Sequence, residues 1–285
     1  MGERAGGYPD GMLLPALLAW SLASAQTRVT LDAHRHFSDR FLGVEIPGLK
    51  SGNSIDRDMA GGGVERALLI SDAYLQQGVA RFRSNEELAA FVAAEPDRFA
   101  GLCGLNTAWD DAVELFERCL ARPGMVGGKL HFRHHKQRMS DPETAERLTR
   151  LADVAERRRA MLLIHMNFES DPAPELAALL AAARGHPLTR FVIAHAAEDS
   201  VALLANAAGA ANVYTEVSTF EIRKPEVLAA GLRSFGIDRV LFGIDGPIYG
   251  AARTLEKFQA LPLTQAEKTR VLETNGAAFW DSLPR

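Results

Sequence analysis

The feature that most constrains the fold is a repeat of short apolar runs and amphipathic segments. From residue 28 onward the apolar runs recur at intervals of roughly 30 residues, the length of one βα unit. Eight of them are predicted to be strands: 29–34, 66–71, 99–105, 126–131, 160–166, 190–195, 212–218 and 239–245. Helix start signals lie between them, such as Asp141 before Pro142 and Thr264 three residues before Glu267. The alternation predicts parallel strands covered by helices.

Eight uninterrupted units favour a closed (β/α)8 TIM barrel over an open, doubly wound sheet. A doubly wound fold usually has a glycine-rich phosphate-binding turn after its first strand, whereas this first strand is followed by Arg35 and His36. No linker-like composition occurs between residues 28 and 283. We therefore predict a single barrel domain over residues 28–285. The stretch 35–64 has three successive glycines and little periodicity, and it is predicted to be a long loop or lid.

Residues 1–27 are predicted to be a signal peptide, with an N-terminal extension packed on the barrel as the alternative. Residues 12–20 (MLLPALLAW) are apolar and are followed by small residues up to Ala25. This pattern is typical of a secretory leader, and the run is too short to span a membrane. The acidic residues Glu3 and Asp10 depart from the usual positive start. We expect a periplasmic or secreted protein if the leader is real, and a cytoplasmic one otherwise.

Composition excludes several classes of partner. The chain is 47% hydrophobic and 24% charged, as in ordinary globular proteins, and its net charge is −4. It therefore lacks the positive footprint of a nucleic-acid-binding protein. We expect a small-molecule substrate, no nucleic acid and no stable membrane span, with a homodimer as the candidate assembly. Cys103 and Cys119 have no metal-like spacing and are predicted to be small buried hydrophobic residues.

Five side chains with ligand or acid–base chemistry are predicted to meet at one end of the barrel. His34 and His36 lie two residues apart on the first strand, so their rings face the same side. His165, His195 and Asp245 lie at the ends of three other predicted strands. All strands of a barrel end at the same mouth, which is where barrel active sites lie. The pattern indicates a metal site with nitrogen and oxygen ligands.

These motifs resemble the amidohydrolase superfamily of metal-dependent barrels. The matching segments are LDAHRHF, LLIHMNF, VIAHAAE and LFGIDGP. Their spacing and the closing helix AEKTRVLETNGAAFW are most similar to the amidohydrolase-2 branch, which includes aminocarboxymuconate-semialdehyde decarboxylase, lactonases and other hydrolases. The resemblance covers about residues 29–283. One departure is Ile244, where the family usually has Ser or Thr before the aspartate.

The resemblance implies one divalent ion bound by His34, His36, His165 and Asp245. Zn²⁺ is the expected ion, with Mn²⁺, Fe²⁺ and Ni²⁺ as alternatives. His195 would stay unligated, and His195 and Asp245 would transfer protons. The predicted function is a hydrolase whose metal-bound water or hydroxide attacks a lactone, ester or amide carbonyl. The alternative is a non-oxidative decarboxylase on the same site, and a less favoured one is an inactive metal-binding protein.

Lys129 leaves the number of metal ions open. Alternation along the predicted strand 126–131 aims its side chain inward. In binuclear members of the superfamily a lysine on the fourth strand is carboxylated and bridges two ions. We favour a single ion because the branch resemblance points that way, with a binuclear site as the alternative. Otherwise Lys129 is a substrate-facing cation or part of a salt bridge.

The segment after the fourth predicted strand is locally basic in an acidic chain. It reads HFRHHKQR over residues 131–138. His131 and Arg133 are candidates for attracting an anionic substrate, although a solvated loop would look the same. Glu216 and Ser218 on the seventh predicted strand, and Ser71 and Asp72 after the second, are weaker candidates for substrate binding or for supporting hydrogen bonds.

Overall fold

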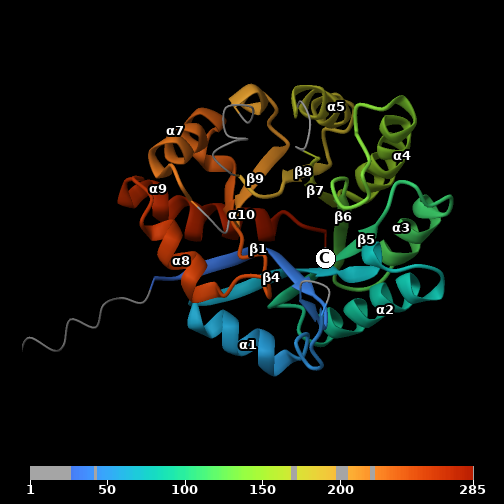
Figure 1. Cartoon of the computed structure of the whole chain (residues 1–285), viewed down its shortest axis with the longest axis horizontal. Coiled ribbons are helices and arrows are strands. Elements are labelled where there is room, and N and C mark those ends of the chain that lie inside the picture. The colour runs from blue at the N-terminus through green and yellow to red at the C-terminus, as the bar shows by residue number, and fades with distance from the viewer. Residues whose placement is uncertain (1–26, 42–43, 168–171, 197–204, 219–221, 285) are drawn as a thin grey trace, which may run out of the picture.

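Eight parallel strands form the centre of the molecule (Figure 1). The computed structural model describes residues 27–41, 44–167, 172–196, 205–218 and 222–284. The strands of the barrel are β1 (Val29–Phe37), β4 (Val64–Ser71), β5 (Phe99–Leu105), β6 (Met125–His131), β7 (Met161–His165), β8 (Arg190–Ile193), β9 (Val213–Val217) and β10 (Val240–Phe242). They are paired in that order from β1 to β10. The predicted leader lies outside the described residues.

The barrel closes between β1 and the residues that follow β10. A parallel bridge joins Arg35 to Gly246. The backbone N–H of Asp245 donates to the carbonyl of His34 at 2.7 Å, and that of His36 donates to the carbonyl of Gly246 at 2.6 Å. With helices between the strands, this confirms the predicted (β/α)8 barrel.

Helices surround the strands as an outer ring (Figure 1). They are α1 (Gly52–Gly61), α2 (Val79–Ala94), α3 (Ala112–Leu120), α4 (Pro142–Arg158), α5 (Pro172–Gly185), α7 (Pro225–Phe235), α8 (Ala251–Gln259), α9 (Gln265–Thr269) and α10 (Asn275–Asp281). Short helical turns occur at η1 (Asp72–Leu75), η2 (Ala205–Ala207), η3 (Ile237–Arg239) and η4 (Arg270–Thr274). Two of the helices begin at the predicted signals. Thr264 and Glu267 form a capping box at the start of α9, and Pro142 is the first residue of α4.

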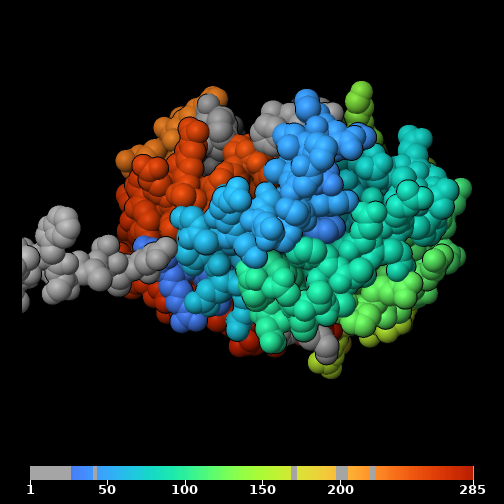
Figure 2. All heavy atoms as spheres, turned by 90° about the horizontal axis from the view of Figure 1, so that it is seen from below, coloured from blue at the N-terminus to red at the C-terminus, as the bar shows by residue number. Residues whose placement is uncertain are grey.

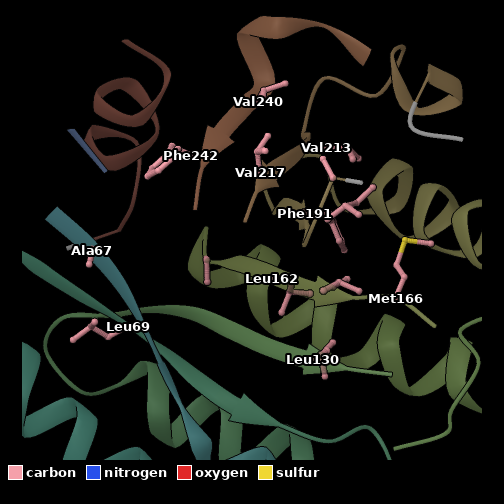
Figure 3. Packing of buried hydrophobic residues seen from close by; sticks show 14 of the residues in the cluster. Ala67, Leu69, Leu130, Leu162, Met166, Phe191, Val213, Val217, Val240 and Phe242 are labelled. Atoms are coloured by element: carbon pink, nitrogen blue, oxygen red, sulfur yellow. The ribbon is translucent and has the colours of Figure 1, made fainter. Parts of the chain in front are cut away.

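Two hydrophobic clusters hold the barrel together because successive strand residues point to opposite faces. The inner cluster includes Leu31, Ile70 and Leu163, and Trp280 of α10 belongs to it. The outer cluster lies between strands and helices, and Figure 3 shows part of it, with Leu130 and Phe191 on nearby strands. Within the described residues, no helix combines the length and the hydrophobicity needed to cross a membrane.

The segment 35–64 is more ordered than predicted. It contains a short antiparallel pair, β2 (Arg40–Phe41) with β3 (Val44–Glu45), and the helix α1. The Ser51 hydroxyl caps α1 by accepting from the backbone N–H of Ser54, and Ile55 and Met59 are its buried residues. That spacing of four places both on one helix face, and α1 lies on the outer surface between α8 and α2 (Figure 2). The prediction of a loop was therefore wrong for residues 52–61.

Cys103 and Cys119 form a disulfide, so the prediction that they are simply buried thiols was also wrong. Both are buried, and their sulfur atoms are bonded across a sequence separation of 16. Cys103 lies on β5 and Cys119 on α3, the helix that follows it. The βα unit brings the outer face of a strand against its own helix, which sequence spacing alone does not show.

Candidate metal centre

His34 is the most buried of the candidate ligands, and its ring is oriented by a carboxylate. It lies on β1 with no exposed surface, and its Nδ1 is 2.7 Å from Oε1 of Glu216 on β9. A ring nitrogen hydrogen-bonded to a carboxylate carries the proton, which leaves the ring's lone pair on Nε2. Nε2 lies 3.3 Å from Oδ1 of Asp245 and 3.2 Å from Nζ of Lys129. His34 is thus prepared to bind a cation through Nε2.

His36 and Asp245 complete a group of three ligand atoms. Nε2 of His36 lies 3.0 Å from Oδ1 of Asp245. That oxygen is buried and has no hydrogen-bond partner. Two ligands bonded to one ion at about 2.1 Å lie about 3.0–3.4 Å apart. The separations of the two histidine nitrogens from Asp245 Oδ1 therefore fit a divalent cation, and a cation would satisfy the orphaned oxygen.

His195 belongs to a second group, with His34 and Glu216. Its backbone N–H donates to Oε1 of Glu216 at 2.9 Å, and its Nδ1 lies 2.9 Å from the hydroxyl of Ser218. The Ser218 hydroxyl in turn donates to the same glutamate oxygen at 2.9 Å. With Nδ1 engaged in this way, Nε2 is the ring nitrogen available for proton transfer. The His195 ring lies 4.7 Å from the His34 ring, centroid to centroid.

The backbone is strained at the two predicted catalytic residues. His195 and Asp245 have φ angles of 60° and 58°, in the left-handed region that side chains disfavour. Strain of this kind concentrates at functional sites, where surrounding contacts hold it. The strands also end earlier than predicted. His195 lies two residues beyond the end of β8 and Asp245 three residues beyond the end of β10, whereas each was predicted to be the last residue of its strand.

His165 lies beside this group rather than in it. It is the last residue of β7, and its ring stacks on His131 with centroids 3.9 Å apart and an angle of 15°. Its ring is also 4.7 Å from that of His195. Burial lowers the pKa of His165 well below its ordinary value, so the ring is neutral, as a metal ligand must be. Its role as the fourth ligand stays a prediction.

Lys129 on β6 is buried inside the barrel, as alternation predicted. Its Nζ lies 3.2 Å from Nε2 of His34. Burial lowers the pKa of Lys129 to about 8, while the charges of Asp245 and Glu216 oppose this change. Lys129 therefore lies within hydrogen-bond distance of a candidate metal ligand.

Glu216 has a larger structural role than the sequence suggested. It is wholly buried, burial raises its pKa, and one of its oxygens accepts from both His195 and Ser218 while contacting His34. Its other oxygen lies over Gly243: a Cβ added there would be 2.3 Å from Oε2. The alternation of Tyr214, Glu216 and Ser218 along β9 was the available signal that Glu216 points inward.

Tyr74 is a neighbour of the site that sequence reasoning missed. It lies in η1, just after β4, and its hydroxyl is 3.5 Å from Nδ1 of His36. Its ring stacks near His131, at 5.7 Å between centroids. Burial raises the pKa of Tyr74, which keeps the hydroxyl protonated. Gly104 makes room for this turn, because a Cβ there would lie 2.7 Å from the Tyr74 backbone nitrogen.

The basic loop 131–138 carries less charge than its sequence suggests. Burial lowers the pKa of His131 to about 2 and that of His135 to about 4, so both rings are neutral at pH 7. Arg138 lies 3.6 Å from the buried carboxylate of Glu175. Arg133 and Lys136 are the other cations, and both are exposed. Attraction of an anionic substrate by Arg133 stays a prediction. Of the weaker candidates, Ser71 caps η1 by accepting from the backbone of Ala73, and Asp72 accepts from Ser38.

Comparison with known proteins decides the family. The sequence pattern of the amidohydrolase family matches residues 31–281. The chain belongs to the amidohydrolase family. The predicted resemblance is thereby confirmed, and this amidohydrolase is an enzyme of that superfamily with residues that suit a divalent metal. No curated protein matches it.

Solved structures with the same fold include several decarboxylases. A 2,6-dihydroxybenzoate decarboxylase from Rhizobium is 16% identical with a TM-score of 0.68, covering 90% of this chain and 99% of that one. A dihydroxybenzoic acid decarboxylase from Polaromonas sp. JS666, with bound manganese and 2-nitroresorcinol, is 16% identical with a TM-score of 0.69 and coverages of 90% and 97%. A 5-carboxyvanillate decarboxylase from Sphingomonas paucimobilis is 16% identical with a TM-score of 0.63 and coverages of 89% and 99%. At these identities the likeness shows the fold.

Proposed function

We propose that this amidohydrolase is a metal-dependent, non-oxidative decarboxylase of a small aromatic carboxylic acid. The observation that carries the proposal is the group formed by His34, His36 and the orphaned oxygen of Asp245. It lies at the carboxyl ends of strands in a fold shared with dihydroxybenzoate and carboxyvanillate decarboxylases. Those likenesses favour the decarboxylase over the hydrolase expected from the motifs, which has support only at the level of the superfamily.

One divalent ion would be held by Nε2 of His34, by His36 and by Asp245, with His165 as the predicted fourth ligand. The nitrogen and oxygen donors suit Zn²⁺, Mn²⁺, Fe²⁺ or Ni²⁺. Manganese in a solved structure of the same fold makes Mn²⁺ the first ion to test, ahead of the Zn²⁺ expected from the sequence. When bound, the ion would neutralise and orient anionic oxygens of the substrate.

The chemistry asked of the side chains is the movement of one proton. The bond between the ring and the carboxylate breaks, CO₂ leaves, and a proton takes its place on the ring carbon. Asp245 is the proposed carrier. Burial would raise its pKa, but its contact with His36 and the charges of His195 and Lys129 outweigh burial and lower it. Asp245 is therefore a carboxylate that can accept a proton from a hydroxyl or acid group of the incoming substrate and pass it to the ring.

His195 and Glu216 are proposed to support this proton transfer. One oxygen of Glu216 contacts the His34 ring and accepts from the backbone N–H of His195, and the His195 ring is held through Nδ1 by Ser218. These contacts set the orientation of both rings. His195 Nε2 is proposed to hold a substrate oxygen by a hydrogen bond. Asp245 and His195 thus retain the proton-transfer roles expected from the sequence, but the reaction differs.

We also propose that the barrel, residues 28–285, works in an oxidising compartment. The Cys103–Cys119 disulfide is a bond that persists in secreted and periplasmic proteins and is rare in the cytosol. It agrees with the leader predicted in residues 1–27.

The test is product analysis on protein purified without chelators. Metal content is measured first, and one ion per chain is expected. Hydroxybenzoic acids labelled with ¹³C at the carboxyl group are then incubated in D₂O. Labelled CO₂ and deuterium at the carbon that lost the carboxylate are expected. Acid release from lactones or esters without CO₂ would replace the decarboxylase by the hydrolase, and two ions per chain would overturn the single-ion scheme.

A further inference from the structure

We propose that Asp32 is a positioning residue that sets the separation between the β1 histidines and Asp245. Asp32 lies on β1, two residues before His34, and is wholly buried. The inference rests on the proposed metal site, but it concerns a residue that does not touch a substrate or a metal.

One oxygen of Asp32 joins the two chain segments that carry the ligands. Oδ1 accepts from the backbone N–H of His34 at 3.1 Å and from that of Ile244 at 2.9 Å. Ile244 immediately precedes Asp245, and His34 is itself a candidate ligand. The carboxylate therefore fixes the backbone on both sides of the group of ligand atoms with a single atom.

This tie lies where the barrel has few ladder hydrogen bonds. Among the described strands, β1 is paired in register with β4, and β10 with β9. Between β1 and the chain after β10 there is one bridge, at Arg35 and Gly246. β10 ends at Phe242, before the ligand-bearing residue. Two backbone hydrogen bonds also join these segments, from Asp245 to His34 and from His36 to Gly246. Asp32 adds a side-chain tie to this short stretch of pairing and extends it to Ile244.

Arg35 and Asp58 hold Asp32 in place. Oδ2 of Asp32 accepts from Nε of Arg35 at 2.9 Å, and Nη2 of Arg35 donates to Asp58 at 2.6 Å. Asp58 lies on α1 and also accepts from the backbone N–H of Ala251 at 3.0 Å. The guanidinium packs against Gly246, where a Cβ would lie 2.9 Å from Nη1. The network thus reaches from α1 to the residue after Asp245.

A network of buried charges is a poor way to add stability, because desolvation offsets most of its attraction. The Arg35 side chain is only 3% exposed and that of Asp32 is fully buried. Fixed geometry is what such a network supplies, and a metal site needs its ligand distances within about 0.2 Å. Loss of Asp32 should therefore weaken metal binding more than it weakens the fold.

The experiment compares Asp32→Ala, Asp32→Asn and Asp58→Asn with a matched control, Glu175→Gln. Glu175 is also a wholly buried carboxylate that accepts from two backbone N–H groups, those of Met139 and Ser140, but it touches neither ligand segment. For each metal-free variant, Mn²⁺ affinity is measured by calorimetry, the Co²⁺ absorption spectrum is recorded, and Tm is determined by circular dichroism.

Asp32→Ala is expected to weaken Mn²⁺ binding about 10- to 100-fold and to change the Co²⁺ spectrum. Asp32→Asn keeps an oxygen for the two backbone donors, so its Mn²⁺ affinity should fall less. Asp58→Asn should show the smallest fall in Mn²⁺ affinity. Glu175→Gln should lower Tm while keeping wild-type affinity and spectrum. If Asp32→Ala does not fold, Asp32→Asn and Asp58→Asn decide by the same measurements.

If the Asp32 and Asp58 variants bind Mn²⁺ with wild-type affinity, this inference is overturned but the proposed metal site is not. Equal weakening by Glu175→Gln also overturns it, because affinity would then follow stability. A wild-type protein that binds neither Mn²⁺ nor Co²⁺ overturns the proposed metal site, and this inference with it.

Discussion

Replacing Glu216 with glutamine is expected to weaken metal binding about 5- to 30-fold while leaving the fold intact. Oε1 of Glu216 lies 2.7 Å from Nδ1 of His34 and accepts from the His195 backbone and the Ser218 hydroxyl, each at 2.9 Å. Hydrogen bonds to a charged group contribute about 1.5–3 kcal/mol, and neutral ones about 0.5–1.5 kcal/mol. Neutralising the carboxylate therefore weakens the hydrogen bond that orients the His34 ring by about 1–2 kcal/mol. The resulting loss of metal affinity is close to the effect seen for partners of metal ligands.

The assay is competition for Mn²⁺ between the protein and a chelator, with Tm of the metal-free protein measured alongside. Little change in Tm is expected, because removing a buried charge also removes its desolvation cost. Unchanged Mn²⁺ affinity in Glu216→Gln would refute the argument. So would a loss of affinity that only accompanies a large fall in Tm.

Gly243→Ala tests the same contact from the other side. The added methyl would lie 2.3 Å from Oε2 of Glu216 and 3.2 Å from Cβ of His34, so the carboxylate must move although its charge is kept. Weaker Mn²⁺ binding is expected here too. Gly185→Ala is the matched control, because a Cβ there meets nothing within 4 Å. Wild-type affinity in Gly243→Ala would show that the position of Glu216 does not matter.

Four further predictions concern turnover, the disulfide, pH and substrate charge. His195→Asn should lower kcat about 10²- to 10⁴-fold yet retain metal in elemental analysis, whereas a mere metal-binding protein would show no turnover to lose. Replacing Cys103 and Cys119 by serine should cost about 3 kcal/mol in denaturant unfolding, and two free thiols in unreduced wild-type protein would contradict the disulfide. Burial lowers the pKa of His34, so its ring should stay neutral through the ordinary histidine range near pH 6.5 in an NMR titration of the metal-free protein, and protonation of His34 within that range would be the contrary result. Arg133→Glu should raise KM for an anionic substrate, less so at high salt, and an unchanged KM would remove Arg133 from substrate binding.

Most of the barrel could be predicted because its signals are local. Each strand was expected within a few residues of its observed bounds, and β5 over its observed range, since burial and alternation are written in consecutive residues. The helix α1 was missed because it has only two buried residues, Ile55 and Met59, and its other residues are mostly polar or glycine, so it has little hydrophobic periodicity. The ends of β8 and β10 were overestimated because left-handed backbone at His195 and Asp245 has no counterpart in the sequence pattern.

The sequence by itself determined the fold class and pointed to His34, His36, His195 and Asp245 at the strand ends, because periodicity and the positions of strand ends follow from neighbours along the chain. Tertiary structure alone decided how those residues are held. Glu216 meets His34 across 182 residues of sequence, and Asp32 meets Ile244 across 212. Such contacts arise only when the barrel closes and brings its first and last strands together. The metal-facing nitrogen of His34, the orphaned oxygen of Asp245 and the Cys103–Cys119 bond all depend on that closure or on the packing of strand against helix.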